Sequence, residues 1–243
     1  MFTSAYEKLD QQARFGNSFD NMTKFLNQDL IFKNREHAGN LLAKELEKYS
    51  FESPVVIGLV RGGVPVAKPI AEKLKGTLDI MASKKIGAPN NPELAIGAVT
   101  SFGDYVISSY SDYEPGDKKS EYLHNQIGYL VNESKEKEKK YRMGLFQVPS
   151  YQGQNIILVD DGIATGMTMF AAVKSIKKQN PKSVIVAVPV ISEQAYEEMK
   201  KHIKLIKALK IPSDFVAVGI HYKSFEAVTD EEIISMLALN KSN

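Results

Sequence analysis

Two adjacent carboxylates, Asp160 and Asp161, follow the apolar run 156–159 and precede a loop rich in glycine and threonine. The loop comprises Gly162, Ile163, Ala164, Thr165, Gly166, Met167 and Thr168. Glycines let a backbone approach an anion closely, and threonine hydroxyls and the free N–H groups of a helix N-terminus donate hydrogen bonds to phosphate. Two carboxylates that faced a phosphate would repel it. They are compatible with a phosphate site if they accept hydrogen bonds from neutral hydroxyls, such as those of a ribose. The stretch therefore predicts a site for a sugar 5-phosphate.

This run, residues 159–168, resembles the phosphoribosyl-diphosphate (PRPP) signature of type I phosphoribosyltransferases. The resemblance implies that Asp160 and Asp161 hold the ribose diol and that residues 164–168 wrap the 5′-phosphate. The chain has no GxxxxGK[ST] motif, and no GxGxxG motif follows a strand. A strand capped by an ordinary turn, with a solvated acid pair, is less favoured because strand, acids, glycines and hydroxyls all fall in order.

Two further polar segments follow predicted strands. Arg61, Gly62 and Gly63 come after the apolar run 55–60 and resemble the family's pyrophosphate loop, whose backbone amides face the leaving diphosphate. Lys84 and Lys85 follow the strand 78–82, where the family places a cationic pair that contacts diphosphate. Close relatives carry Arg-Lys there, and lysine keeps the charge but loses the bidentate fork. A solvated basic turn is the alternative for this pair.

The elements that must position these residues are strands 55–60, 78–82, 156–159, 183–189 and 204–208, with helices between them. Apolar runs of this kind are typical of a parallel sheet that is buried on both faces. The resemblance, which covers about residues 31–240, implies a doubly wound, mostly parallel α/β sheet with a helical and hairpin insertion and a C-terminal hood. Ligands should then bind at the carboxyl ends of the strands.

The ends of the chain differ in character. Residues 1–30 are polar with scattered aromatics and are interpreted as an N-terminal extension of a phosphoribosyltransferase-like domain at 31–243. Asn34 is predicted to cap the helix that follows, and Arg35 and His37 at its start are interpreted as surface groups. Near the other end, Thr229 and Glu232 form a predicted capping box.

An insertion is expected at about residues 103–150. Before it, residues 86–95 predict a loop because they are rich in Pro, Gly and Asn. Residues 98–102 and 105–108 predict a hairpin, and residues 111–116 are turn-like. A long helix is predicted from Lys119 to Arg142, and its charged end is interpreted as a solvated face. Contact with RNA or with another subunit is the alternative for that helix.

The hood is expected at about residues 209–226, over the acceptor base. The resemblance makes Phe215, Val216 and Tyr222 candidates for base contact, with Phe215 or Tyr222 stacking on the base. For each aromatic, simple packing is an equal alternative.

Composition sets outer bounds. The chain of 243 residues is 43% hydrophobic, enough for one α/β domain, and its net charge of +2 gives no reason to expect a nucleic-acid partner. It has no cysteine, which excludes disulfides and thiolate chemistry. Neither a signal peptide nor a membrane span is apparent, so a cytoplasmic location without a membrane partner is expected.

The resemblance implies transfer of 5-phosphoribosyl from PRPP to a free nitrogenous base with release of pyrophosphate, as in nucleotide salvage. Arg61, Lys84 and Lys85 would stabilise the departing diphosphate. Mg²⁺ would be bound mainly through PRPP rather than by a protein cage. We also expect a homodimer.

Two departures from the family pattern bear on the acceptor. Purine-salvage members carry a carboxylate that can act as general base at the position of Ala164, and an aliphatic residue is usual at Gly162. Two other functions also stay open, because a fold and its site do not guarantee turnover. One is a PRPP- or nucleotide-binding regulator with little catalysis that binds RNA or a partner, and the other is a phosphate-ester hydrolase that uses the same pocket.

Overall fold

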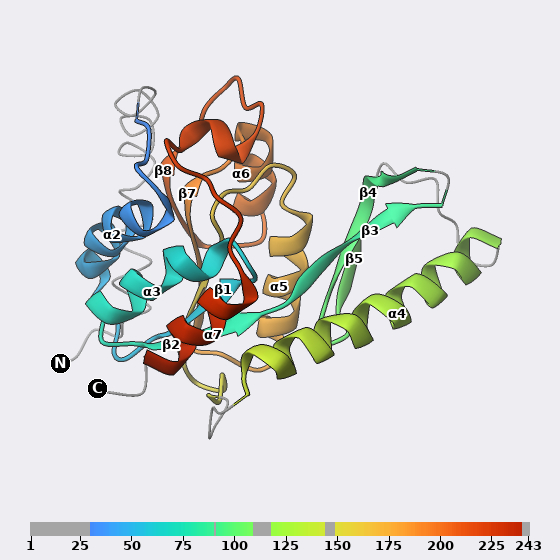
Figure 1. Ribbon diagram of the computed structural model, residues 1–243, viewed down its shortest axis with the longest axis horizontal. Coiled ribbons are helices and arrows are strands. Elements are labelled where there is room, and N and C mark those ends of the chain that lie inside the picture. The colour runs from blue at the N-terminus through green and yellow to red at the C-terminus, as the bar shows by residue number, and fades with distance from the viewer. Residues whose placement is uncertain (1–29, 90, 109–117, 144–148, 240–243) are drawn as a thin grey trace.

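The computed structural model describes residues 30–89, 91–108, 118–143 and 149–239. The expected extension, apart from residue 30, and the turn at 111–116 lie outside these residues. The centre of the described part is a five-stranded parallel sheet in the order β2-β1-β6-β7-β8 (Figure 1). Its strands are β1 (Val55–Leu59), β2 (Thr77–Met81), β6 (Asn155–Val159), β7 (Ser183–Val190) and β8 (Leu205–Lys210). The predicted strands and the doubly wound α/β class are confirmed.

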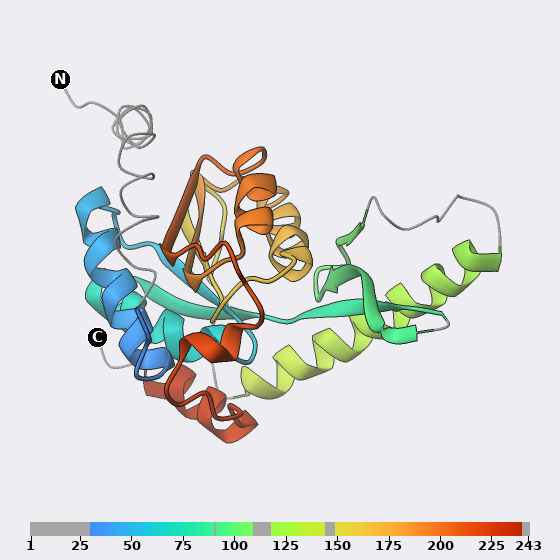
Figure 2. The ribbon, with the colours of Figure 1, turned by 90° about the horizontal axis from the view of Figure 1, so that it is seen from above.

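Helices cover both faces of this sheet (Figure 2). One face carries α2 (Arg35–Leu46), α3 (Gly63–Lys73) and α7 (Asp230–Leu239), and the other carries α5 (Met167–Lys177) and α6 (Glu193–Lys200). The short 3₁₀ helices are η1 (Glu47–Tyr49) and η2 (Val218–His221). Strand β6 shows why both faces must be covered: Ile157 and Val159 join one apolar cluster, Ile156 and Leu158 the other, and all four are fully buried.

Side-chain caps mark where α2 and α7 begin. The Asn34 Oδ1 atom accepts a hydrogen bond from the His37 N–H at 2.8 Å, as predicted for the start of α2. At α7 the Thr229 N–H donates to Glu232 Oε2 at 2.7 Å, and the Glu232 N–H donates to Thr229 Oγ1 at 3.2 Å. The predicted capping box is therefore confirmed.

A second, antiparallel sheet and a long helix form an arm that extends away from the parallel sheet in both views (Figures 1 and 2). The arm comprises β3 (Ser83–Ala88), β4 (Asn91–Thr100), β5 (Tyr105–Ile107) and α4 (Lys118–Tyr141). Ile86 and Val99 are fully buried between this sheet and the apolar side of α4. The predicted long helix and the predicted hairpin are both confirmed.

The loop prediction for residues 86–95 was wrong. Most of these residues lie in β3 and β4, with irregular pairing on either side of Gly87. The reason is tertiary: Ile86 is fully buried and Ile96 is 6% exposed, and burial of this apolar face outweighs the local preference of Pro, Gly and Asn for a turn.

The strand order reverses between β1 and β6. From β1 the chain continues to β2 on one side, and from β6 it continues to β7 and β8 on the other. Loops that leave the carboxyl ends of two such strands diverge and leave a crevice, which is where open α/β sheets bind ligands. The loops at this crevice are residues 60–63 and 160–166. No helix in the described part of the chain combines the length and apolarity needed to cross a membrane.

Candidate functional site

The acid pair begins directly at the carboxyl end of β6. The Asp161 N–H donates to Asp160 Oδ1 at 2.9 Å, so the first carboxylate is turned back over the loop. Burial, and next to it the charge of Asp161, raises the pKa of Asp160 well above its usual range. Burial also raises the pKa of Asp161, although the neighbouring Arg35 guanidinium opposes this rise. Two mostly buried carboxylates therefore share one polar site.

Arg35 holds the second carboxylate in place. Its Nε atom lies 2.8 Å from Asp161 Oδ2, and its Nη1 atom donates to the Glu226 carbonyl at 2.7 Å. The guanidinium lies over the ring of Phe225, 3.8 Å from the ring centroid. The interpretation of Arg35 as a surface group was wrong, because its side chain is only 12% exposed and joins α2 to the acid pair.

The phosphate loop runs from the acid pair into α5. The Ile163 N–H donates to the Val190 carbonyl at 2.9 Å, which anchors the loop to the end of β7. Gly166 is the N-cap of α5 and has φ +80°, a conformation that favours glycine. Within the described residues no side chain caps this helix. Its first N–H groups therefore remain available to an anion, beside the exposed Thr165 and the partly exposed Thr168.

The second glycine-containing loop lies against the acid pair. A Cβ atom added to Gly62 would lie 2.0 Å from Asp161 Oδ2, so glycine is required for this approach. The Val60–Arg61 peptide bond is cis. The Arg61 side chain turns away from the acids, and its Nη1 atom lies 3.7 Å from Asp230 Oδ1 of α7. The structure thus brings the two predicted loops together and separates the Arg61 side chain from the carboxylates.

The two adjacent lysines point to opposite sides, as successive residues of a strand do. Lys84 forms an ion pair with Glu133 of α4. Lys85 lies on the side of the acid pair, where its charge acts to lower the pKa of Asp160 against the larger effect of burial. The cationic pair predicted from the sequence is therefore divided between the arm and the ribose side.

The hood residues have different environments. Val216 is 79% exposed, whereas Phe215 is partly buried and its ring centroid lies 5.7 Å from that of His221. Tyr222 is 6% exposed, and its hydroxyl donates to the Asp161 carbonyl at 2.6 Å. A buried tyrosine in this position supports the backbone of the acid pair, and its ring faces Phe32 and Phe225.

Three side chains at the site were not identified from the sequence, namely Arg35, Glu133 and Asp230. Each reaches a site residue that is distant along the chain. Their only local signals were a helix start for Arg35 and a capping box beside Asp230, and neither signal indicates a partner.

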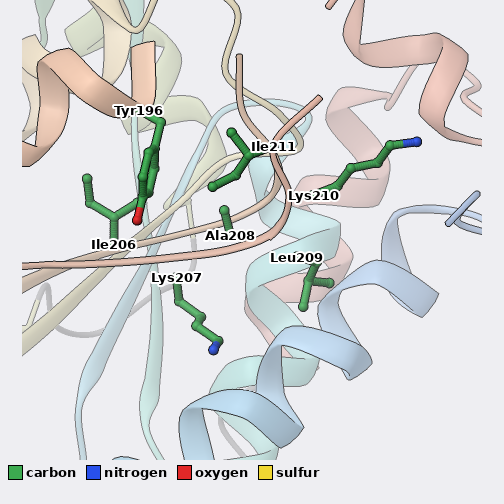
Figure 3. A pocket seen from close by; sticks show the side chains of 7 residues that line it. All are labelled: Tyr196, Ile206, Lys207, Ala208, Leu209, Lys210 and Ile211. Atoms are coloured by element: carbon green, nitrogen blue, oxygen red, sulfur yellow. The ribbon is translucent and has the colours of Figure 1, made fainter. Parts of the chain in front are cut away.

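Two hollows in the described part lie away from the acid pair. One, of about 20 Å³, has room for a single water and lies along β8 (Figure 3). Its lining residues are Tyr196, Ile206, Lys207, Ala208, Leu209, Lys210 and Ile211. The other, of about 380 Å³, lies between α4 and the turn after β4 and includes Phe102 and Lys139. The candidate site is instead the crevice at the carboxyl ends of β1 and β6, where the strand order reverses.

Comparisons with known proteins bear on this site. Residues 27–224 match the family described as phosphoribosyl transferase domain. Two proteins of Mycobacterium tuberculosis, strains CDC 1551 / Oshkosh and H37Rv, are each named "putative phosphoribosyl transferase". Each is 32% identical over 208 residues, 85% of this chain and 46% of the relative. This chain thus spans about half the length of these curated relatives.

Two further proteins are similar over different lengths. A ribose-phosphate pyrophosphokinase from Wolinella succinogenes is 32% identical over 136 residues, which make up 51% of this chain and 44% of that protein. The crystal structure of TT1426 from Thermus thermophilus has a TM-score of 0.73 and 40% sequence identity. That match covers 85% of this chain and 97% of TT1426.

Proposed function

Because this chain belongs to the type I phosphoribosyltransferase family, we propose that it transfers the 5-phosphoribosyl group of PRPP to a nitrogenous base and releases pyrophosphate. The observation that carries the proposal is the contact between the two loops at the strand-order reversal, where Gly62 lies against Asp161. A ribose diol on the acid pair would then lie between the diphosphate loop and the uncapped N-terminus of α5.

The proposed roles follow from charge. Asp160 and Asp161 accept hydrogen bonds from the ribose hydroxyls, and these bonds favour the ionised carboxylates against the effect of burial. Thr165, Thr168 and the first N–H groups of α5 bind the 5′-phosphate. As the bond between C1 and the diphosphate breaks, negative charge collects on the leaving group. The amides of residues 61–63, with Arg61, Lys84 and Lys85, stabilise that charge.

A divalent cation such as Mg²⁺ fits this site as a companion of the diphosphate. In the part of the chain that the structure describes, no group of three or more His, Cys, Asp or Glu side chains could hold a metal. The diphosphate oxygens and water would supply most of its ligands, and Asp160 and Asp161 are the nearby hard oxygen donors of the protein. When bound, the cation would neutralise charge on the leaving group.

The acceptor base is proposed to lie between the phosphate loop and the hood. Val218 of η2 packs on the loop, since a Cβ atom on Gly162 would lie 2.5 Å from Val218 Cγ1. Beside it, Val216 and Ile220 are 79% and 57% exposed and offer apolar contact to a flat base. Ala164 supplies no carboxylate, so a base that needs no proton removed at that position suits the site. Nucleotide salvage is the role that this reaction would serve.

The test is pyrophosphate release from PRPP and Mg²⁺ in the presence of each of a panel of free purines and pyrimidines. We expect release that depends on one base, together with formation of the matching 5′-monophosphate. The double variant Asp160→Asn/Asp161→Asn should lose this activity, and Lys44→Gln, an exposed change at the far end of α2, should keep it.

Other results would redirect the assignment. Release of pyrophosphate with no base present would favour the hydrolase. PRPP binding without turnover would favour the regulator. If the double variant bound PRPP as tightly as the wild type, the acid pair would not be the ribose site.

A further inference from the structure

Two cations near the diphosphate site, Arg61 of the loop and Lys84 of β3, form ion pairs with carboxylates of α7 and α4. Lys84 pairs with Glu133 of α4, and Arg61 lies near Asp230 of α7. Asp230 in turn accepts a hydrogen bond from the hydroxyl of Tyr141, at the end of α4, at 2.7 Å. Each of these two cations is therefore linked to α4 through a carboxylate, Lys84 through Glu133 and Arg61 through Asp230.

Helix geometry places a third cation between these two links. Glu133, Lys137 and Tyr141 are four residues apart and share one face of α4. Burial, and then the charge of Arg61, lowers the pKa of Lys137; the charge of Asp230 opposes this, the charge of Lys84 adds to the lowering, and the charge of Glu133 opposes it. The Lys137 Nζ atom lies 5.8 Å from the centroid of the Tyr141 ring. Three positive groups from three segments thus lie around two carboxylates, Glu133 and Asp230, and a more highly charged anion could take the place of these carboxylates.

The order of polar groups at the carboxyl ends of the strands indicates which anion fits the site. Lys84 follows β2, Arg61 follows β1, the acid pair follows β6, and the threonine loop leads into α5. PRPP carries its groups in a matching order, with diphosphate, ribose and 5′-phosphate in line. A ribose on the acid pair would direct the diphosphate toward β1 and β2, where α4 closes the site.

We propose that Lys137 joins Arg61 and Lys84 in a three-cation site for the terminal phosphate of the diphosphate, and that Glu133 and Asp230 are internal counter-ions which this phosphate displaces. The inference rests on the proposed function, because ribose binding at Asp160 and Asp161 sets the direction of the diphosphate. Lys137 is then a substrate-binding residue supplied by the arm.

Titration calorimetry with the full chain tests this, using inorganic pyrophosphate with Mg²⁺ in one series and ribose 5-phosphate in another. Lys137→Gln should weaken pyrophosphate binding roughly tenfold or more, since charge-assisted hydrogen bonds are lost. Ribose 5-phosphate binding should not change. Lys137→Arg should stay within about threefold of the wild type because the charge remains. Glu133→Gln frees Lys84 and should tighten pyrophosphate binding, and Lys139→Gln, an exposed residue of the same helix, is the matched control.

Three outcomes would overturn the inference. If the wild type binds both ligands and Lys137→Gln binds pyrophosphate equally well, the site is wrong but the proposed function stands. If Lys137→Gln and Lys137→Arg weaken pyrophosphate binding alike, Lys137 has a structural role and not a charge-binding one. If the wild type binds neither ligand, the proposed function fails and this inference fails with it.

Discussion

Arg35 shows how one side chain can organise a site from a distance. It lies at the start of α2, yet it contacts the Asp161 carboxylate, the Glu226 carbonyl and the Phe225 ring. These contacts fix the guanidinium in position and orientation. The carboxylate that it holds therefore has one preferred orientation before any ligand arrives, which lowers the entropy cost of binding a ribose.

Arg35→Gln should raise the KM for PRPP by about tenfold or more, because a hydrogen bond to a charged group contributes about 1.5–3 kcal/mol. Arg35→Lys should recover only part of the loss, since lysine lacks the planar fork that spans Asp161 and Glu226. Steady-state kinetics check this, with Lys44→Gln on the same helix as control. An unchanged KM in Arg35→Gln would contradict a positioning role.

Gly62 and Gly128 differ in the space around them, so the same substitution at each should have opposite effects. In Gly62→Ala the new methyl group would lie 2.0 Å from Asp161 Oδ2, so the loop or the acid must move and PRPP binding should be lost. In Gly128→Ala the methyl group meets nothing within 4 Å on α4, and the helix should gain about 0.8–1 kcal/mol. Thermal melting and PRPP titration of both variants check the contrast. Equal PRPP affinity in the two variants would contradict it.

The sequence predicts site residues that lie close together along the chain, and it does not predict contacts between residues that are far apart along the chain. Asp160, Asp161 and Thr165 lie within one strand-loop-helix segment, so their spacing alone indicated a sugar-phosphate site. The partner of Asp161 is 126 residues away along the chain. No periodicity relates Arg35 to Asp161, because the contact exists only after α2 has packed on the sheet.

Among the elements, α4 and α7 are joined through one carboxylate. Asp230 accepts hydrogen bonds from Lys140 Nζ at 2.8 Å and from the Tyr141 hydroxyl at 2.7 Å. The hydrogen bond from Lys140, followed by that from Tyr141, lowers the pKa of Asp230 to about 2. The ionised carboxylate is therefore the form that holds the two helices together.

The sign of the pH dependence follows. Because the pKa is lower in the folded state than the usual 3.8, the stabilisation is fully present above pH 3.8 and is lost as the pH falls toward 2. Wild type and Asp230→Asn should therefore differ in urea midpoint near neutral pH, and the difference should shrink as the pH falls from about 4 to about 2. Glu231→Gln, in the same turn, should follow the wild type. A constant difference across this range would contradict the assignment.

The elements were predicted best where they bury an apolar face by themselves. The strands of the parallel sheet are continuous apolar runs, and α4 has a clear helical pattern. Residues 86–95 failed because their strand pairing depends on α4, which lies some 30 residues later. The charged end of α4 was interpreted as a solvated face, but Glu138 is only 6% exposed.

For the whole molecule, the question is what ties the arm to the parallel sheet. Arg142, just after α4, donates to Asp79 Oδ1 of β2 at 2.9 Å, to Glu138 Oε2 at 2.6 Å and to the Ile80 carbonyl at 2.7 Å. The Tyr151 hydroxyl donates to Asp79 Oδ2 at 2.6 Å. Asp79 is 1% exposed, so these hydrogen bonds take the place of water around its carboxyl group.

Arg142→Met should lower the free energy of unfolding by about 3 kcal/mol, near the low end for breaking a buried pair, because the side chain retains 15% exposure. Urea unfolding measures this, and Lys139→Met, an exposed change near the end of α4, should change little. A loss below about 1 kcal/mol would mean that water replaces the guanidinium without cost.

The expected homodimer stays a prediction, which light scattering on the full chain would test.

The pairing of β1 with β6 has a consequence for how the protein acquires activity. Val55 lies opposite Ile156, so the two loops that meet at the acid pair are brought together by segments about 100 residues apart. Such long-range pairing is slow to form, since a large loop must close first. During refolding, the helical signal should therefore recover before the capacity to bind a sugar phosphate. Ligand binding would then report completion of the fold rather than its beginning.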